Sequence, residues 1–482
     1  MTAARLLDRI FFQHEPHHPR LIRTFQVSFI AMLLALFVLF ICIDGRENLG
    51  YSAIHFAIIG LSLMHLMWLR RFNLGASYSL FALFFFGVIP LFEYRLGITY
   101  NDASTPRDSS YMVAAALALL SSVCFYFGYG LHRGVPLDVA AMEPLRYSNA
   151  RHRQTAVVAA CIVLVLMALS IAAFYQFSWH SILLRGYGED MEQSAMGNAF
   201  ITYYARPIFF NILFIMMMDA MHRDPPLRKR AFLLGCLAVF FVAPIGIPRS
   251  LAGALYIPLL MIVLLPRYLS KYSVLCVILF AVLFAAPIAD VFRQINHTEG
   301  SVELGQNFNL DYLFSGHFDA FHNLAQVIEL DYRSEGWQVV GILLFWVPRA
   351  FWEGKPLSTS FDFADFAGWE AHNISFSLPA EFYVDYGVAG VAVGMFIIGL
   401  LYRRLDMFFS RRMVEGTIGR YVYVVSHFEL SVLGLYLVRG SVLSSFAYTI
   451  GLASTLLTIR IAERVLRGLA LGARSAATVA LR

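Results

Sequence analysis

Long apolar stretches recur along this chain from residue 25 to residue 458. A helix needs about 20 apolar residues to cross the hydrocarbon core of a bilayer, and twelve stretches reach or approach that length. They are residues 25–43, 51–69, 75–92, 110–131, 155–176, 200–221, 231–246, 250–266, 273–289, 381–402, 421–438 and 441–458. Hydrophobic residues make up 59% of the chain and charged residues only 14%, which excludes an ordinary soluble domain. We therefore expect an all-α, polytopic integral membrane protein with about twelve transmembrane helices.

The cations indicate how the chain is oriented, because Lys and Arg beside membrane spans are retained on the cytoplasmic side. With the N-terminus placed inside, 26 of the 37 cations fall in the predicted cytoplasmic segments. Both termini are then cytoplasmic, and the large insert at residues 290–380 is extracytoplasmic. These flanking cations also account for the net charge of +5, so no nucleic-acid partner is expected.

The sequence divides into three parts on this reading. Residues 1–289 hold transmembrane helices 1 to 9, residues 290–380 form one large loop, and residues 381–482 hold helices 10 to 12 and a cytoplasmic tail. Within the loop, the stretch from Trp337 to Trp352 is mostly apolar but too short to span comfortably. We interpret it as an interfacial or re-entrant segment.

The large loop is rich in ionisable side chains, and we expect them to meet a polar substrate. These residues are His317, Asp319, His322, Arg349, Lys355 and His372. A folded cap that only covers the bundle is the alternative. The spacing of His317, Asp319 and His322 also allows a metal site, but catalytic metals normally need three protein ligands in fixed geometry. We favour hydrogen bonds to the polar substrate, and we expect neither a metal nor a cofactor.

Five arginines lie at or near the predicted outer ends of spans, where a guanidinium can bind phosphate oxygens in bidentate fashion. They are Arg185, Arg206, Arg249, Arg349 and Arg439. Arg206 falls inside a span, and a cation at the centre of a membrane helix costs about 2.5–3.5 kcal/mol on insertion scales. It therefore needs a ligand or a partner. Extension of its side chain to the interface, or pairing with a loop carboxylate, would also satisfy it.

Two local motifs resemble a known family. His372-Asn373, followed by Glu381, Gly387 and Gly390, is similar to the His-Asn and Glu-x-Gly-x-x-Gly signature of bacterial O-antigen polymerases and ligases. Upstream, Pro348-Arg349, Trp352 and Lys355-Pro356 resemble a pattern in Wzy-type oligosaccharide repeat-unit polymerases. Five residues separate the glutamate from the first glycine here, which departs from the family pattern.

The resemblance implies a GT-C-like, metal-independent glycosyltransferase in the bacterial inner membrane. It would join undecaprenyl-diphosphate-linked oligosaccharide repeat units at the periplasmic face into O-antigen, capsule or exopolysaccharide. The growing chain would move from its lipid diphosphate to a new lipid-linked unit. A flippase and a chain-length regulator are candidate partners beside the bilayer.

Roles for individual residues follow from that reaction. His372 is the candidate base for the acceptor hydroxyl, since histidine titrates near the working pH, although it could instead be a structural histidine at the start of the tenth span. The candidates for stabilising the diphosphate leaving group are Arg185, Arg249 and Arg349. The candidates for substrate binding are Arg206, His317, Asp319, His322, Lys355, Asn373 and Glu381.

Three other functions fit parts of the sequence. An O-antigen ligase would share the His-Asn signature and use a lipid A core acceptor. A flippase or transporter for the same lipid-linked glycan would favour paired broken helices and internal repeats, whereas the polar residues here are concentrated in one loop. A non-catalytic partner that sets polymer length would make His372 and the arginines dispensable.

Overall fold

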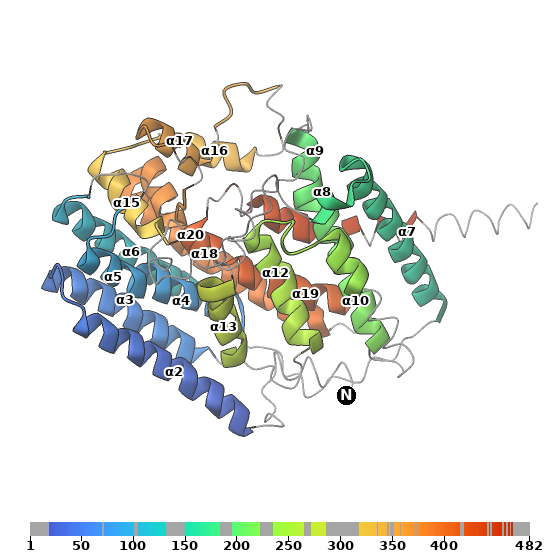
Figure 1. The fold of residues 1–482 in the computed structure, drawn as a ribbon, viewed down its shortest axis with the longest axis horizontal. Helices are drawn as coiled ribbons and strands as arrows, with labels where there is room; N and C mark the ends of the chain where they lie inside the picture. Colours follow the sequence, from blue (N-terminus) through green and yellow to red (C-terminus); the bar gives the residue numbers. More distant parts are fainter. Residues whose placement is uncertain are drawn as a thin grey trace, which may run out of the picture.

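The computed structural model describes most of the two apolar regions and part of the loop between them. The described residues are 19–69, 72–100, 105–131, 150–183, 195–221, 235–264, 271–285, 318–334, 336–344, 347, 351–356, 358–370, 372, 374–414, 419–440, 443, 446–455, 457–458, 461–462 and 464–465. Every regular element within them is a helix, as the sequence predicts (Figure 1).

The first nine predicted spans each overlap a helix, and several of these helices pass through a π-helical turn, marked η. The elements are α2 (Pro19–Cys42), α3 (Leu49–Trp68), α4 (Leu74–Ala82), η1 (Leu83–Val88), α5 (Ile89–Leu96), α6 (Asp108–Gly130), α7 (Ala150–Phe174), α8 (Trp179–Leu183), α9 (Ala195–Phe200), η3 (Ile201–Ala205), α10 (Arg206–Met221), α12 (Arg249–Leu259), η4 (Leu260–Leu264), α13 (Lys271–Phe280) and η6 (Ala281–Ala285). Between α10 and α12, residues 235–241 are also helical. Asn48 and Asn73 begin α3 and α4 because their side chains accept backbone N–H groups of the first turns, from Tyr51 at 3.1 Å and Ala76 at 2.8 Å.

Short helices follow in the large loop, and long helices return after it. The loop contains α15 (Ala320–Glu329), α16 (Trp337–Leu343) and α17 (Thr359–Phe366), and the later helices are α18 (Leu378–Val414), α19 (Gly419–Leu433) and α20 (Tyr436–Arg439). The three loop helices lie together at one end of the bundle (Figure 1). We call the described residues of 318–372 the cap. With only seven residues, α16 is far too short to span a bilayer.

Among the described residues, four helices are long and apolar enough to cross a membrane: Leu49–Trp68, Leu74–Leu96, Asp108–Gly130 and Leu378–Arg411. Five shorter apolar helices overlap other predicted spans, and the total of twelve stays a prediction. The helix from Leu74 to Leu96 is almost wholly buried, whereas α2 exposes large apolar side chains such as Leu34, Phe37 and Ile41 along its length. An apolar outer surface around a buried central helix is the arrangement of an α-helical membrane protein.

The pair α6 and α18 packs closely along much of its length. A Cβ on Gly128 of α6 would lie 2.2 Å from the Phe396 carbonyl oxygen of α18, and a Cβ on Gly399 would lie 2.2 Å from the Phe125 carbonyl oxygen of α6. The two backbones touch at both glycines, as small residues permit between membrane helices. This contact fixes α18 against α6.

The glycines of the predicted family signature shape the start of α18. Gly387 has φ 62° and ψ −153°, a conformation that is essentially restricted to glycine, and it interrupts the helix there. A Cβ on Gly390 would lie 2.4 Å from the Phe382 carbonyl oxygen. This part of the motif therefore has a conformational explanation, and it bends the chain between the cap and the rest of α18.

Polar contacts attach the cap to these two helices. The Glu329 carboxylate of α15 accepts from the Ser110 hydroxyl at 2.7 Å, from the Arg107 Nε at 2.7 Å and from the Arg107 backbone N–H at 3.1 Å, at the start of α6. Asp385 of α18 accepts from the Val339 N–H at 3.0 Å and from the Ser334 hydroxyl, beside the start of α16. The cap is thus bound to both members of the α6–α18 pair.

We predict that Gly399→Ala destabilises the protein, because the added methyl must push two backbones apart. Overpacking of this kind costs about 1–3 kcal/mol. Gly130→Ala is the matched control: it lies on α6 with no atom within 4 Å of its Cβ position, and the change should leave stability unchanged or slightly raised. Thermal unfolding of the purified protein in lipid bilayers would compare the two. Equal midpoints for both variants would contradict the close packing.

We also predict that attachment of the cap weakens at acidic pH. The Ser110 and Arg107 donors lower the pKa of the Glu329 carboxyl from its ordinary value near 4.3. A carboxyl with a lowered folded pKa contributes stability above its unfolded value and loses it as the pH falls through the folded value. At pH 7, Glu329→Gln should speed hydrogen exchange of the α15 amides about two- to five-fold, as for a partly exposed pair.

The comparison of Glu329→Gln with wild type should be repeated at pH 3, where protonation of the Glu329 carboxyl reduces the difference between them. Glu353→Gln, which changes an exposed carboxylate of the cap, serves as the control and should match wild type at both values. A difference of the same size at pH 3 as at pH 7 would exclude the carboxylate charge as its cause.

Candidate functional site

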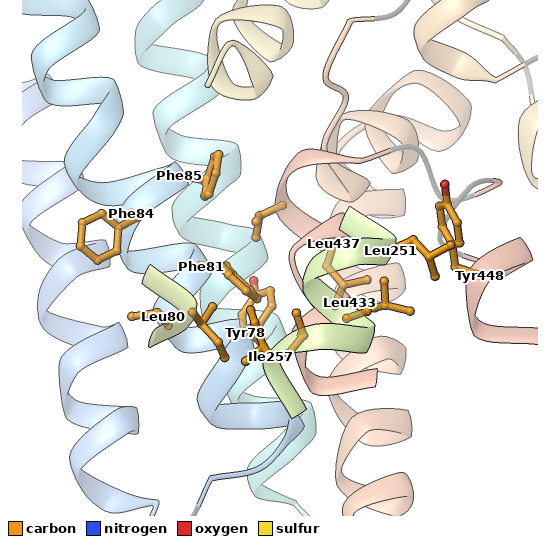
Figure 2. Close-up of a cluster of buried hydrophobic side chains, with 14 of the residues drawn as sticks. Tyr78, Leu80, Phe81, Phe84, Phe85, Leu251, Ile257, Leu433, Leu437 and Tyr448 are labelled. Carbon is orange, nitrogen blue, oxygen red and sulfur yellow. The ribbon is translucent and has the colours of Figure 1, made fainter. Parts of the chain in front are cut away.

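A pocket opens at the cap end of the bundle, between the helix Leu74–Leu96, α12, α13 with η6, and α19 with α20. Its empty space is about 680 Å³, a volume that includes the part open to the outside. Two cations line it, Arg249 and Arg439, while the other lining side chains are mostly apolar and include Phe81, Phe85, Ile257, Ile278, Val282 and Leu433. Figure 2 shows the buried side chains of this region and labels Phe81, Phe85, Ile257 and Leu433, which come from three different helical segments.

Local structure places both arginines at helix ends. Pro248, the residue before α12, has φ −56° and ψ 137°, and Arg249 is the first residue of that helix. Arg439 is the last residue of α20. The backbone N–H groups of a first helical turn carry partial positive charge, so the start of α12 adds to the charge of the two guanidinium groups. Both side chains are half-buried.

Ser250 and Tyr436 join the helices that carry these arginines. Their hydroxyl groups form a hydrogen bond between α12 and α20, and both residues line the pocket. One turn of each helix is thereby fixed relative to the other. The pocket thus combines an apolar interior with cations at one end, an arrangement suited to an amphiphilic anion.

Asp319 lies close to the pocket but is enclosed by protein. Its neighbour Phe318 lines the pocket and stacks on Phe85 with ring centroids 5.6 Å apart. The Asp319 carboxylate accepts from the Asn323 side chain at 3.0 Å and from the Ser375 N–H at 3.4 Å. Burial raises the pKa of the Asp319 carboxyl, whereas these hydrogen bonds and the charge of Arg439 act in the opposite direction.

The segment after His372 connects the cap to the pocket. We call residues 374–377 the strap. The Asn323 side chain donates to the Ser375 carbonyl at 2.7 Å, and the Phe376 N–H donates to the Arg439 carbonyl at 3.1 Å. The strap is therefore bound on one side to α15 and on the other to a residue that lines the pocket.

His372 itself lies in the cap and is not among the residues that line the pocket. Its ring stacks on Phe361 with centroids 4.6 Å apart, and Nε2 lies 3.8 Å from an oxygen of the exposed Asp365 carboxylate. The side chain is 35% exposed, which leaves it partly open to a ligand. The structure does not bring His372 into direct contact with Arg249, and its catalytic role stays a prediction.

Other predicted substrate-binding residues are engaged with protein groups. His322 is fully buried, with Nδ1 3.0 Å from the Tyr111 hydroxyl and Nε2 3.3 Å from the Gln326 amide. Burial lowers the pKa of His322 to about 4, which keeps the ring neutral at physiological pH. Lys355 donates to the Val347 carbonyl at 3.0 Å, and Glu381 is buried in the first turn of α18.

Arg206 is 2% exposed and belongs to a different part of the bundle from the pocket. Its guanidinium donates to the Gly246 carbonyl at 2.6 Å and to the Ile182 carbonyl at 3.0 Å, and it lies over the Tyr175 ring at 5.1 Å. These partners tie α10 to the ends of two neighbouring segments. Backbone carbonyl groups thus provide part of the hydrogen bonding that a buried cation requires.

The predicted residues Arg185, His317, Arg349 and Asn373 lie outside the described residues.

Two residues of this region were not among the catalytic or substrate-binding candidates chosen from the sequence. Arg439 is one of the five arginines at predicted outer span ends, but nothing in its local sequence pairs it with Arg249. Glu93, which the sequence predicts to lie in a loop, is in α5 and fully buried, where it accepts from the Tyr100 hydroxyl at 2.7 Å. Its helix extends to Leu96, beyond the predicted end of the third span at residue 92.

Comparisons with known proteins give no relative for this chain. No family model, no curated protein and no solved structure matches it.

Proposed function

We propose that this protein is a membrane glycosyltransferase that polymerises undecaprenyl-diphosphate-linked oligosaccharide repeat units at the periplasmic face of the bacterial inner membrane. The observation that carries the proposal is the pocket with Arg249 and Arg439 at its polar end and apolar helices around the rest. An isoprenoid diphosphate has the complementary form, with a charged head and a hydrocarbon tail. The choice of a polymerase rests on the sequence motifs around Arg349 and His372, which resemble those of Wzy-type polymerases.

The arginines would act on the leaving group. When the glycosidic bond to the lipid diphosphate breaks, negative charge builds up on the departing phosphate oxygens. Two guanidinium groups fixed in place beforehand stabilise that charge without reorganising, which is the usual source of large electrostatic effects in enzymes. The N–H groups at the start of α12 favour an anion in the same place.

His372 remains our candidate for the base that removes the acceptor proton. Its partly exposed ring supports this role. So does its position two residues before the strap, which is bonded to the Arg439 carbonyl. Asp365, beside Nε2, would help to orient the ring. The acceptor sugar would then approach from the cap, and the donor diphosphate would occupy the pocket.

We predict that Arg249→Ala and Arg439→Ala each reduce polymerisation by about 10²–10³-fold, the usual effect of removing one electrostatic donor. The measurement is the length distribution of lipid-linked glycan on gels, in a host that supplies the repeat unit, at equal membrane expression. Single units should accumulate in both variants. Arg249→Lys, which keeps the charge but loses bidentate geometry, should fall between Arg249→Ala and wild type.

Arg46→Ala is the matched control, because Arg46 is an exposed arginine that pairs with Asp108 at 3.2 Å and does not line the pocket. Its ladder of glycan chain lengths on the gel should equal that of wild type. Long lipid-linked chains that fail to reach the lipid A core in the pocket variants would favour a ligase. Loss of all periplasmic glycan would favour a flippase, and unchanged ladders would exclude the pocket as the reaction site.

For the proposed base we predict that His372→Ala slows polymerisation by about 10²–10⁴-fold, the range for loss of a positioned acid or base. His180→Ala, which changes a half-buried histidine in α8, should leave the ladder unchanged. Unfolding midpoints of both variants should be measured in parallel. A full ladder in folded His372→Ala would identify His372 as a structural histidine of the cap.

A further inference from the structure

A buried carboxyl and a buried amide meet between α10 and α19. Glu429 of α19 is 0% exposed and Asn211 of α10 is 1% exposed. The Asn211 Nδ2 donates to Glu429 Oε2 at 3.2 Å. Both residues fall within stretches that the sequence predicts to span the membrane. An ionisable side chain at such a depth is rare and calls for an explanation.

The remaining oxygens of this pair have no hydrogen-bond donor. Glu429 Oε1 and Asn211 Oδ1 are each buried without a partner. If Glu429 were ionised, both atoms would be acceptors only, and one amide hydrogen would be the sole compensation for a buried negative charge. The effective cost of burying one ion is several kcal/mol. The ionised form thus leaves two groups unsatisfied at once.

The charged groups on the helices packed against α19 are occupied elsewhere. Arg206 at the start of α10 donates to two backbone carbonyls. Asp406 of α18 lies 2.7 Å from His427 of α19 itself. Arg249 is the first residue of α12 and lines the pocket. None of the described cations forms an ion pair with Glu429.

We propose that Glu429 is a proton-binding site and that its protonated form makes a cyclic acid–amide pair with Asn211. A proton taken from water adds to Oε1 of the carboxylate, giving a neutral carboxyl with one O–H donor and one carbonyl acceptor. A primary amide offers the complementary acceptor and donor. The O–H of Oε1 donates to Asn211 Oδ1 while Nδ2 donates to Oε2, so one proton satisfies both buried oxygens.

The site lies beside one wall of the pocket. Val432 and Leu433, three and four residues after Glu429, line the pocket and lie on the same face of α19. Without the proton, Glu429 Oε1 and Asn211 Oδ1 would both be acceptors and would repel each other, which would weaken the contact between α10 and α19. Proton binding is therefore linked to the position of that wall. The site itself does not depend on the proposed function.

Infrared spectroscopy tests the protonation directly, because a neutral carboxyl has a carbonyl stretch that a carboxylate lacks. The difference spectrum between wild type and Glu429→Gln in lipid bilayers at pH 7 should contain that band. Asn211→Leu should keep the band but move it to higher frequency, since the carbonyl loses its hydrogen bond. The exposed Glu353→Gln should give no band at pH 7. A band for Glu429 that appears only near pH 4 would overturn the proposal.

Thermal unfolding gives a second readout. Glu429→Gln should unfold close to the wild-type midpoint, because two amides can form the same pair of hydrogen bonds, whereas Glu429→Ala should have a lower midpoint. A midpoint for the glutamine variant as low as that for alanine would contradict the acid–amide pair. Added NaCl and KCl should stabilise wild type equally. Selective stabilisation by one of these cations, without the infrared band, would overturn the proposal in favour of a metal-cation site.

Discussion

The close contact between α6 and α18 supports the cap, which lies beside the pocket. Gly128 and Gly399 let the two backbones touch, and a side chain at either position would separate them. Arg107 and Ser110, at the cap end of α6, hold Glu329 of α15. The strap leads directly into α18. The position of the cap over the bundle therefore follows from two glycines in the apolar part of the chain.

The buried carboxyl groups of the bundle have different partners, and one of them, Asp406, joins several helices. Asp406 accepts from the Tyr129 hydroxyl at 2.6 Å and from the Leu74 N–H at 3.1 Å, besides its contact with His427, so it joins four helices. Glu93 has the Tyr100 hydroxyl as its donor. Glu429 has one amide. A low-dielectric interior makes every such pairing specific, which explains how largely apolar helices adopt one arrangement.

Much of the helical content could be predicted from the sequence, because a run of apolar residues determines a membrane helix locally. The contacts that build the site could not. Arg249 and Arg439 are 190 positions apart, and their meeting at one pocket depends on the packing of α12 against α19 and on the hydrogen bond between Ser250 and Tyr436. The burial of Glu93 depends on packing of α15 over α5 in the same way. Hydropathy cannot distinguish a loop carboxylate from one enclosed by another element.

The strap connects the cap to Arg439 at the pocket through hydrogen bonds. Ser375 is bound to Asp319 and Asn323 of the cap, and its neighbour Phe376 is bound to the Arg439 carbonyl. A shift of the strap would therefore move the backbone of a residue that lines the pocket. Asp319 is positioned to oppose such a shift, since it accepts from the strap and also feels the charge of Arg439. Two adjacent residues, Ser375 and Phe376, thus link the cap to the backbone of a residue that lines the pocket.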